Sequence, residues 1–161
     1  MMSWLAGQVK KSEFECRMIE LSVIEKLSDA KLLDVGCGDG MVTLKFAKEI
    51  GTKNISGIEI VQENIDKAIA IGIDAHLGDL NQRLPFENES FDVIIASHVI
   101  EHVYDTDTFL KEVYRNLKVG GYVVVATPNL AAWLHIFFLI FGKQPTIAEL
   151  SDFALVGTWS R

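Results

Sequence analysis

A glycine-rich turn directly after an acidic residue is the first feature of this chain whose residue types could do chemistry. Gly36, Gly38 and Gly40 follow Asp34 at every second position. Glycine tolerates positive φ angles, and because it lacks a Cβ it lets a ligand lie directly on the backbone. The helix expected after the turn would point its first amides at that ligand, as in nucleotide sites. A G-x-G spacing alone also occurs in turns that bind nothing, so the surrounding residues decide.

A second acid stands where a sugar-binding carboxylate is expected. The segment from Asn54 to Ile60 is typical of a strand, and it carries Glu59 about 20 residues beyond the glycine turn. A carboxylate at this point can accept hydrogen bonds from both hydroxyls of a ribose. The dinucleotide fingerprint G-x-G-x-x-G is not matched, because the third glycine is Gly40 and the x-x-G slot holds Met41. The pattern therefore favours a nucleoside ligand without a diphosphate.

Four motifs in order carry a family resemblance. Asp34 to Gly40 reads as an acid, one apolar residue and G-x-G-x-G, and Gly78 to Leu80, Phe91 to Ser97 and Leu117 to Asn129 follow. Together they resemble the class I S-adenosylmethionine-dependent methyltransferases over roughly residues 30 to 130. Within that family the chain is most similar to the small-molecule branch, including menaquinone-type enzymes and methyltransferase-like proteins associated with methionine biosynthesis.

The resemblance implies S-adenosyl-L-methionine as the cofactor, with S-adenosyl-L-homocysteine as its product. Asp34 and the glycine turn would contact the methionine part, Glu59 the ribose, and Asp79 with the Leu80 amide the adenine, on which Ile60 would pack. The predicted cofactor-binding residues are Asp34, Gly36, Gly38, Gly40, Glu59, Ile60, Asp79, Leu80 and Ser97. Each acid also has a purely structural interpretation. Asp34 could cap the glycine turn, Glu59 could be an exposed acid at a strand end, and Asp79 could belong to an ordinary Gly-Asp turn.

The segment from His98 to His102, HVIEH, allows two interpretations. It has the H-x-x-E-H spacing of the inverted zinc peptidases, in which two imidazoles project from one helical face. It follows a buried strand directly, however, and few downstream acids remain as a third ligand, so we expect no metal. The family resemblance implies instead that Ser97 and His98 line the methyl-donor pocket. The roles of Glu101 and His102 stay open between the pocket and a structural turn.

The resemblance further implies transfer of a methyl group to a small-molecule acceptor by in-line displacement. Holding the acceptor in line with the methyl group supplies much of the catalysis, so a strong base is not compulsory. For a hydroxyl or an acidic carbon an imidazole would help, and the predicted catalytic residues are His98 first and His102 second. The alternatives are a cofactor-binding module or truncated form without turnover, an NAD-dependent oxidoreductase, and an H-x-x-E-H zinc hydrolase.

Strand and helix patterns alternate along the chain and set the expected fold. Strands are predicted at 31–35, 54–60, 74–77, 91–97 and 122–126, with helices after the glycine turn, at 62–71 and at 108–118. Ile65, Ala68, Ile69, Phe109, Leu110, Val113 and Leu117 are expected to face inward, and Gly120-Gly121 to turn the chain into the last strand. This alternation predicts an α/β fold with a mostly parallel sheet and right-handed crossovers. The family resemblance implies that the fold is Rossmann-like and doubly wound, with strand order 3-2-1-4-5 and helices on both faces.

We expect one domain in three parts. Residues 1–30 form a lead-in helix, opened by a capping box from Ser12 to Glu15 and facing inward through Met18, Leu21 and Leu27. Residues 31–129 form the cofactor-binding core, and 130–161 form an apolar helix and an incomplete C-terminal segment. The usual strands six and seven are expected to be absent, as in a fragment or a short form. The apolar run is too short for a bilayer span and would be buried or used in self-association; an interfacial helix or a substrate lid is the alternative.

Composition narrows the function classes. The formal net charge is −7 and the pI about 5.0, without the basic surface of a nucleic-acid binder, so no nucleic-acid partner is expected. The two cysteines, Cys16 and Cys37, form no C-x-x-C pair, which favours neither a zinc site nor a disulfide. No secretory signal pattern is seen at the N-terminus. These features predict a cytoplasmic protein.

Overall fold

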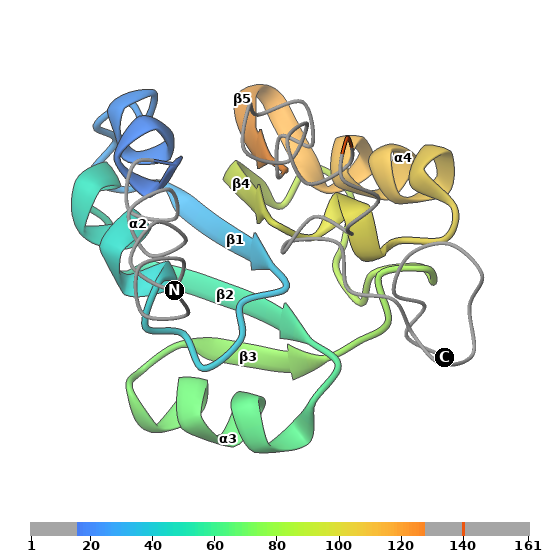
Figure 1. The fold of residues 1–161 in the computed structure, drawn as a ribbon. Helices are drawn as coiled ribbons and strands as arrows, with labels where there is room; N and C mark the ends of the chain where they lie inside the picture. The colour runs from blue at the N-terminus through green and yellow to red at the C-terminus, as the bar shows by residue number, and fades with distance from the viewer. Residues whose placement is uncertain (1–15, 128–139, 141–161) are drawn as a thin grey trace.

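The computed structural model describes residues 16–127 and residue 140, and its centre is a five-stranded parallel sheet (Figure 1). The strands are β1 (Lys31–Val35), β2 (Asn54–Glu59), β3 (Asp74–Leu77), β4 (Phe91–Ser97) and β5 (Leu117–Ala126). They pair in the order β3-β2-β1-β4-β5, so the predicted order is confirmed. The strand order reverses between β1 and β4, which is where ligands bind in open α/β sheets.

Helices cover both faces of this sheet. They are α2 (Thr43–Ile50), α3 (Gln62–Ala70), α4 (Thr106–Asn116) and the short 3-10 helix η1 (Ile100–His102), and residues 16–22 are also helical. Phe46 of α2 packs with Leu32 on one face, whereas Phe109 of α4 packs with Leu33 on the other. Because successive side chains of a strand point to opposite faces, these two neighbouring leucines pack into two separate hydrophobic cores.

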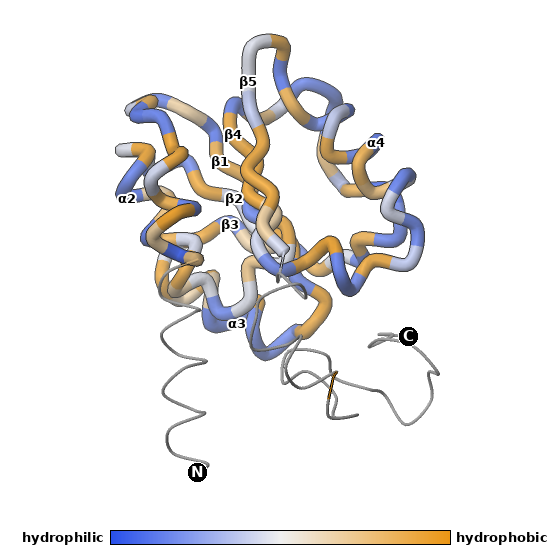
Figure 2. The backbone as a smooth tube through the Cα atoms, turned by 45° about the horizontal axis from the view of Figure 1, so that its top comes forward, coloured by the Kyte–Doolittle hydropathy of each residue, from blue (hydrophilic) through white to orange (hydrophobic). Residues whose placement is uncertain are grey.

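The strands supply most of the buried apolar surface. Figure 2 shows hydrophobic positions concentrated along them, with more hydrophilic positions in the outer loops. β4 lies between β1 and β5, and Val93, Ile94 and Ile95 in it are all fully buried. A central parallel strand covered on both faces needs such a continuous apolar run, which is why the sequence pattern alone identified it.

Two helices differ in detail from the sequence-based expectation. α3 buries Ile65 and Ala68 as expected, but Ile69 is 53% exposed. α4 begins at Thr106, two residues early, because the carboxylate of Asp105 accepts a hydrogen bond from the Thr108 amide and caps the helix. Leu110 of α4 is 42% exposed, so its predicted inward position is wrong.

The glycine pair before the last strand does not separate it from α4. β5 begins at Leu117, directly after the helix, and its pairing with β4 shifts register between Phe91 and Val93. Gly120 has a φ of 84°, and a Cβ on Gly121 would lie 2.6 Å from the Asp92 carbonyl oxygen. The pair thus forms an irregularity within β5, where only glycine fits against the neighbouring backbone.

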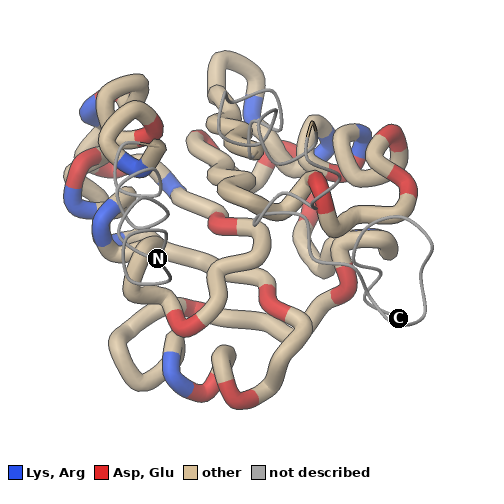
Figure 3. Tube along the Cα trace, viewed as in Figure 1, with Lys and Arg blue, Asp and Glu red and all other residues tan. Residues whose placement is uncertain are grey.

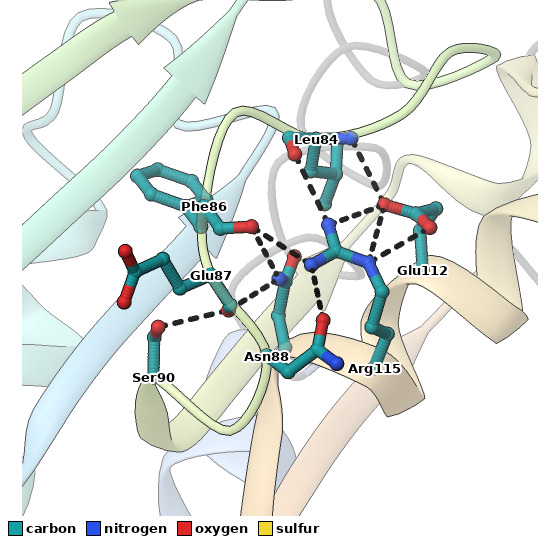
Figure 4. A network of polar contacts seen from close by, with 8 residues as sticks. Leu84, Phe86, Glu87, Asn88, Ser90, Glu112 and Arg115 are labelled. Carbon is teal, nitrogen blue, oxygen red and sulfur yellow. Dashed lines mark hydrogen bonds and ion pairs between the residues drawn. The ribbon is translucent and has the colours of Figure 1, made fainter.

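A polar network ties the loop before β4 to α4 (Figure 4). The Arg115 guanidinium donates to the carbonyl oxygens of Phe86 at 2.8 Å and Leu84 at 3.1 Å. It also pairs with the Glu112 carboxylate at 2.6 Å, which in turn accepts from the Leu84 amide at 3.0 Å. The Arg115 side chain from α4 therefore donates hydrogen bonds to two backbone carbonyls of a loop that lies outside the sheet.

Some expectations lie partly or wholly outside the described residues. These are the capping box at Ser12 and the other residues before 16, and the segments 128–139 and 141–161. The predicted apolar helix and the expected absence of strands six and seven concern these last two segments. In the lead-in segment the helix ends at residue 22, and Met18 and Leu27 are about half exposed, so their predicted inward positions are wrong. Within the described residues, no helix has the length and hydropathy to cross a membrane.

Candidate functional site

The glycine turn joins β1 to α2 and lies open on one side. Gly36, Gly38 and Gly40 have φ angles of 81°, 55° and 81°. A Cβ on Gly36 would come within 2.5 Å of a Val99 methyl carbon, whereas a Cβ on Gly38 would meet nothing within 4 Å. Gly36 thus allows close packing, and the Gly38 backbone faces free space. Gly40 is different, because a Cβ there would lie 2.4 Å from Ile73, so it packs against the protein interior.

Asp34 is a buried carboxylic acid at the end of β1. It is 4% exposed, and its Oδ2 accepts a hydrogen bond of 2.6 Å from the Thr43 hydroxyl, at the start of α2. Burial raises the pKa of Asp34 to about 7, an effect opposed by the Thr43 hydrogen bond and the Arg17 charge. This carboxylate is poorly compensated by its neighbours and would be stabilised by a cationic ligand.

Glu59 holds the glycine turn to the end of β2. Its Oε2 accepts from the Gly38 amide at 3.0 Å, and its Oε1 accepts from the Ile60 and Val61 amides at 2.9 Å each. These three bonds fix the direction of the carboxylate. A carboxylate has about four acceptor positions, so one position on Oε2 is left for a further donor.

Asp79 and Leu80 follow β3 in a turn. Asp79 Oδ1 accepts from the backbone amide of Asn81 at 2.9 Å and from its side-chain amide at 2.8 Å. The Gly-Asp turn predicted as the structural alternative is therefore present. It does not exclude a binding role, because Asp79 and Leu80 both line the cavity described next.

A cavity of about 270 Å³ brings together five of the nine predicted cofactor-binding residues and both predicted catalytic histidines, from four chain segments. It is lined by Gly36, Ile58, Glu59, Ile60, Gly78, Asp79, Leu80, Asn81, His98, Val99, His102 and Val103. Small-molecule sites span about 300–1,000 Å³, so this cavity suits part of a nucleoside-sized ligand. Ile60 is 50% exposed there and offers an apolar face. Asp34, Gly38, Gly40 and Ser97 do not line the cavity.

A larger hollow of about 550 Å³ lies elsewhere. Lys31, Asn54, Asp74 and Phe91, which begin β1, β2, β3 and β4, line it, so it lies at the amino ends of the strands. At the opposite edge, Asp34, Glu59 and Asp79 lie at or just after the carboxyl ends of β1, β2 and β3, and Figure 3 shows acidic positions in the turns there. Because open parallel sheets bind ligands at the carboxyl ends, the smaller cavity is the better candidate.

His98 sits at the β4 end of this cavity in an unusual backbone conformation. Its φ is 55°, a region that non-glycine residues rarely occupy. Its Nε2 lies 3.6 Å from Glu20 Oε1 and its Nδ1 lies 3.7 Å from Glu101 Oε1. His102, in η1, lines the same cavity. η1 spans three residues, too few to carry both histidines on one helical face, and the described residues contain no cluster suited to a metal.

Two functional candidates, Arg17 and Glu20, were missed by sequence reasoning. Arg17 Nη1 donates to the Ser97 hydroxyl at 3.0 Å and pairs with Glu20 Oε2 at 2.5 Å. The Ser97 hydroxyl donates to the same Glu20 oxygen at 3.1 Å. Glu20 is only 4% exposed. An arginine and a glutamate three apart on a helix usually form a solvated pair, so no signal in the sequence distinguished these two.

Comparison with known proteins gives one family. The model described as "Methyltransferase domain" matches residues 33–125. The mitochondrial ubiquinone biosynthesis O-methyltransferase of Rattus norvegicus is 32% identical over 73% of this chain and 36% of its own length. The ubiquinone/menaquinone biosynthesis C-methyltransferase of Geotalea daltonii is 30% identical over 83% of this chain and 62% of its own.

Solved structures agree with this result. An S-adenosylmethionine-dependent methyltransferase from Mesorhizobium loti superposes with a TM-score of 0.61 at 25% identity, over 68% of this chain and 51% of that chain. One from Thermotoga maritima gives a TM-score of 0.60 at 26% identity, over 87% and 68%. The chain spans 33% to 49% of the length of the first ubiquinone O-methyltransferases that it matches.

Proposed function

The chain belongs to the class I S-adenosylmethionine-dependent methyltransferases, and we propose that it methylates a hydroxyl group on a small aromatic acceptor of the quinone-precursor type. The observation that carries the proposal is the cavity where Glu59, Asp79 and the glycine turn meet beside His98. The hydroxyl acceptor is favoured because several relatives at about 30% identity are O-methyltransferases of ubiquinone biosynthesis. A single C-methyltransferase among the relatives reported above makes a ring carbon the second choice.

The described residues fit S-adenosylmethionine. The open Gly38 backbone and the buried Asp34 would take the methionine part, since a cationic ammonium would compensate an acid that burial disfavours as an anion. Glu59 would accept one ribose hydroxyl at the remaining position of Oε2, beside the Gly38 amide. The orientation of Glu59 by backbone amides means that little ordering would be needed on binding.

The adenine would lie between the turns after β2 and β3. Ile60 offers an apolar surface for the ring, and Asp79 with the Leu80 amide lies on the same cavity wall. Asp79 Oδ1 is engaged by Asn81, so we assign the adenine amino group to the other carboxylate oxygen. This arrangement makes the cavity of about 270 Å³ the nucleoside part of the site.

The chain's own task in the reaction is to position the acceptor and to take its proton. S-adenosylmethionine supplies an electrophilic methyl group whose bonding electron pair stays with the departing sulfur. His98, at the β4 rim of the cavity, would accept the hydroxyl proton while an oxygen lone pair forms the new bond to carbon. His102 lies on the same cavity and is the second candidate for this role.

A labelled transfer assay tests the proposal. With S-adenosylmethionine carrying tritium in its methyl group, the protein should label a catechol but not the same ring with both hydroxyls already methylated. His98→Ala should lower kcat about 100-fold and leave cofactor affinity within about twofold, because a general base contributes about 10² to 10⁴ in rate. Cofactor binding without label transfer to any hydroxylated ring would instead indicate a binding module without turnover.

A further inference from the structure

Glu20 carries a buried carboxylate oxygen that the interactions described so far leave unused. Its Oε2 serves both Arg17 and Ser97, at 2.5 and 3.1 Å. Its Oε1 is buried and accepts no hydrogen bond from the described part of the chain. A buried carboxylate oxygen without a donor is costly, and such atoms in native proteins call for an explanation. Neutralising Arg17 cannot be the whole reason for Glu20, because Oε2 alone does that.

The polar atom that Oε1 faces is His98 Nε2, at 3.6 Å. This distance is slightly too long for a hydrogen bond, as catalytic contacts often are before substrate binds. The backbone of His98 is held by its amide, which donates to the Ala126 carbonyl at 2.8 Å. The residue lines the cavity with a φ of 55°, and such backbone strain concentrates at functional sites.

The charged groups around His98 come from three sides. Glu20 and Arg17 belong to the helix of residues 16–22, and Glu101 Oε1 lies 3.7 Å from Nδ1. Glu59, Asp79 and His102 line the same cavity. The Glu20 side chain is 5% exposed and that of Glu101 is 24% exposed. Because water screens the more exposed charge more strongly, Glu20 has the larger influence on which ring nitrogen carries the proton.

We propose that Glu20 is a positioning residue for His98: its Oε1 accepts from the Nε2–H and leaves Nδ1 as the nitrogen that takes the acceptor's proton. The inference rests on the proposed function, in which His98 is the base. In the step itself the acceptor O–H proton moves to Nδ1, the oxygen pair forms the O–C bond, and the C–S pair stays on sulfur. Glu20 remains a carboxylate throughout.

Substituting Glu20→Gln should reverse the tautomer of His98. The side-chain amide oxygen of the variant would accept from Arg17, the stronger donor, so the amide NH₂ group would face His98 Nε2. Because an NH₂ group can only donate, Nε2 would then have to carry a lone pair and Nδ1 the proton. Imidazole ¹⁵N spectra at a pH of about 8.5, where free imidazoles are neutral, report this directly. We expect Nε2–H for the wild type and Nδ1–H for Glu20→Gln, with the signals assigned by their loss in His98→Gln. Glu49→Gln, at an exposed position on α2, is the matched control and should match the wild type.

The ¹⁵N spectra test the positioning role of Glu20 separately from the proposed function. They are recorded with and without S-adenosylhomocysteine, whose binding is seen from other resonances. If S-adenosylhomocysteine does not bind, the proposed function fails. The tautomer of His98 in the free protein still tests the positioning role of Glu20. A wild-type His98 with Nδ1–H, or a tautomer unchanged in Glu20→Gln, would overturn the positioning role. The wild-type result stands even if the variant does not fold.

Kinetics distinguish a positioning role of Glu20 from a merely structural one, because only a positioning role would lower kcat through His98. Glu20→Gln should lower kcat about 10- to 100-fold while KM for S-adenosylmethionine stays within about twofold. In the His98→Gln background the same substitution should cost nothing further, because its effect passes through the missing imidazole. Losses that multiply in the double variant would show that Glu20 acts independently of His98 and would contradict the proposal.

Discussion

At the scale of single residues, Asp34 combines a cost to folding with an expected gain in binding. Its pKa is about 7 in the folded chain against 3.8 for an ordinary aspartic acid, because burial disfavours the anion. The folded state therefore holds this proton more tightly than the unfolded chain does. The stability associated with the protonated acid is fully present below about pH 3.8 and is lost as pH rises through about 7.

Asp34→Asn should remove this pH dependence. We expect the free energy of unfolding of the variant to equal that of the wild type near pH 4 and to exceed it by an amount on the order of 1–3 kcal/mol at pH 8. Urea unfolding at both pH values measures the difference. The same variant should bind S-adenosylmethionine more weakly, since the amide cannot compensate an ammonium. A variant that is less stable at pH 8 and binds equally well would assign Asp34 a structural role only.

The residue scale also shows where sequence reasoning reaches its limit. Asp34, Glu59 and Asp79 were identified by their match to the family's motifs, and Glu59 also by its distance of about 20 residues from the glycine turn. Glu20 was not identified, because its burial depends on how the helix of residues 16–22 packs against the end of β4. The local pattern places Leu21 inward correctly, since it packs against the core, but it also places Met18 inward, and that residue is half exposed. Tertiary packing decided this point, and periodicity could not.

At the scale of elements, Arg115 connects α4 to the loop that carries the chain from β3 to β4. Its side chain is 17% exposed and makes three kinds of contact, seen in Figure 4: an ion pair with Glu112, hydrogen bonds to two carbonyl oxygens and one hydrogen bond to Asn88. The Arg115 hydrogen bond lowers the pKa of Glu112, so this part of the stability is present above about pH 4.5 and falls as pH drops.

Arg115→Ala should destabilise the fold by about 2–4 kcal/mol, because it removes the cationic partner of the Glu112 carboxylate and a donor to the Leu84 and Phe86 carbonyls. For a chain of this size that lowers Tm by roughly 5–15 °C. Arg115→Lys should recover only part of the loss, since an ammonium lacks the planar fork of donors. Lys45→Ala, at an exposed position on α2, is the control. Thermal melts of the three variants decide, and an Arg115→Ala melt equal to that of the control would contradict this role.

The glycine pair of β5 shows why element boundaries were harder to predict than the elements themselves. Gly120-Gly121 is typical of a turn, and the sequence-based prediction placed the strand after it. The structure instead continues the strand through the pair, and the Asp92 carbonyl lies too close to Gly121 for any side chain there. The need for glycine was evident locally, but its cause lies on a neighbouring strand.

At the scale of the whole molecule, the alternation of strands and helices predicted a parallel sheet, and the family resemblance supplied its strand order. Right-handed crossovers leave few arrangements for five parallel strands, and an almost wholly apolar β4 must lie inside the sheet. This topology then brings residues 36, 59, 79 and 98 to one cavity although 62 positions separate the first from the last. We therefore expect the carboxyl edge of this sheet to bind one S-adenosylmethionine.

Titration calorimetry of the purified chain with S-adenosylmethionine tests that claim most directly. The wild type should bind with a Kd of about 1–100 μM and should show no heat with NAD. Glu59→Ala should weaken binding at least tenfold, because a charged hydrogen bond contributes about 1.5–3 kcal/mol, whereas Glu49→Ala should not. Folded wild-type protein that takes up neither S-adenosylmethionine nor S-adenosylhomocysteine would contradict the account.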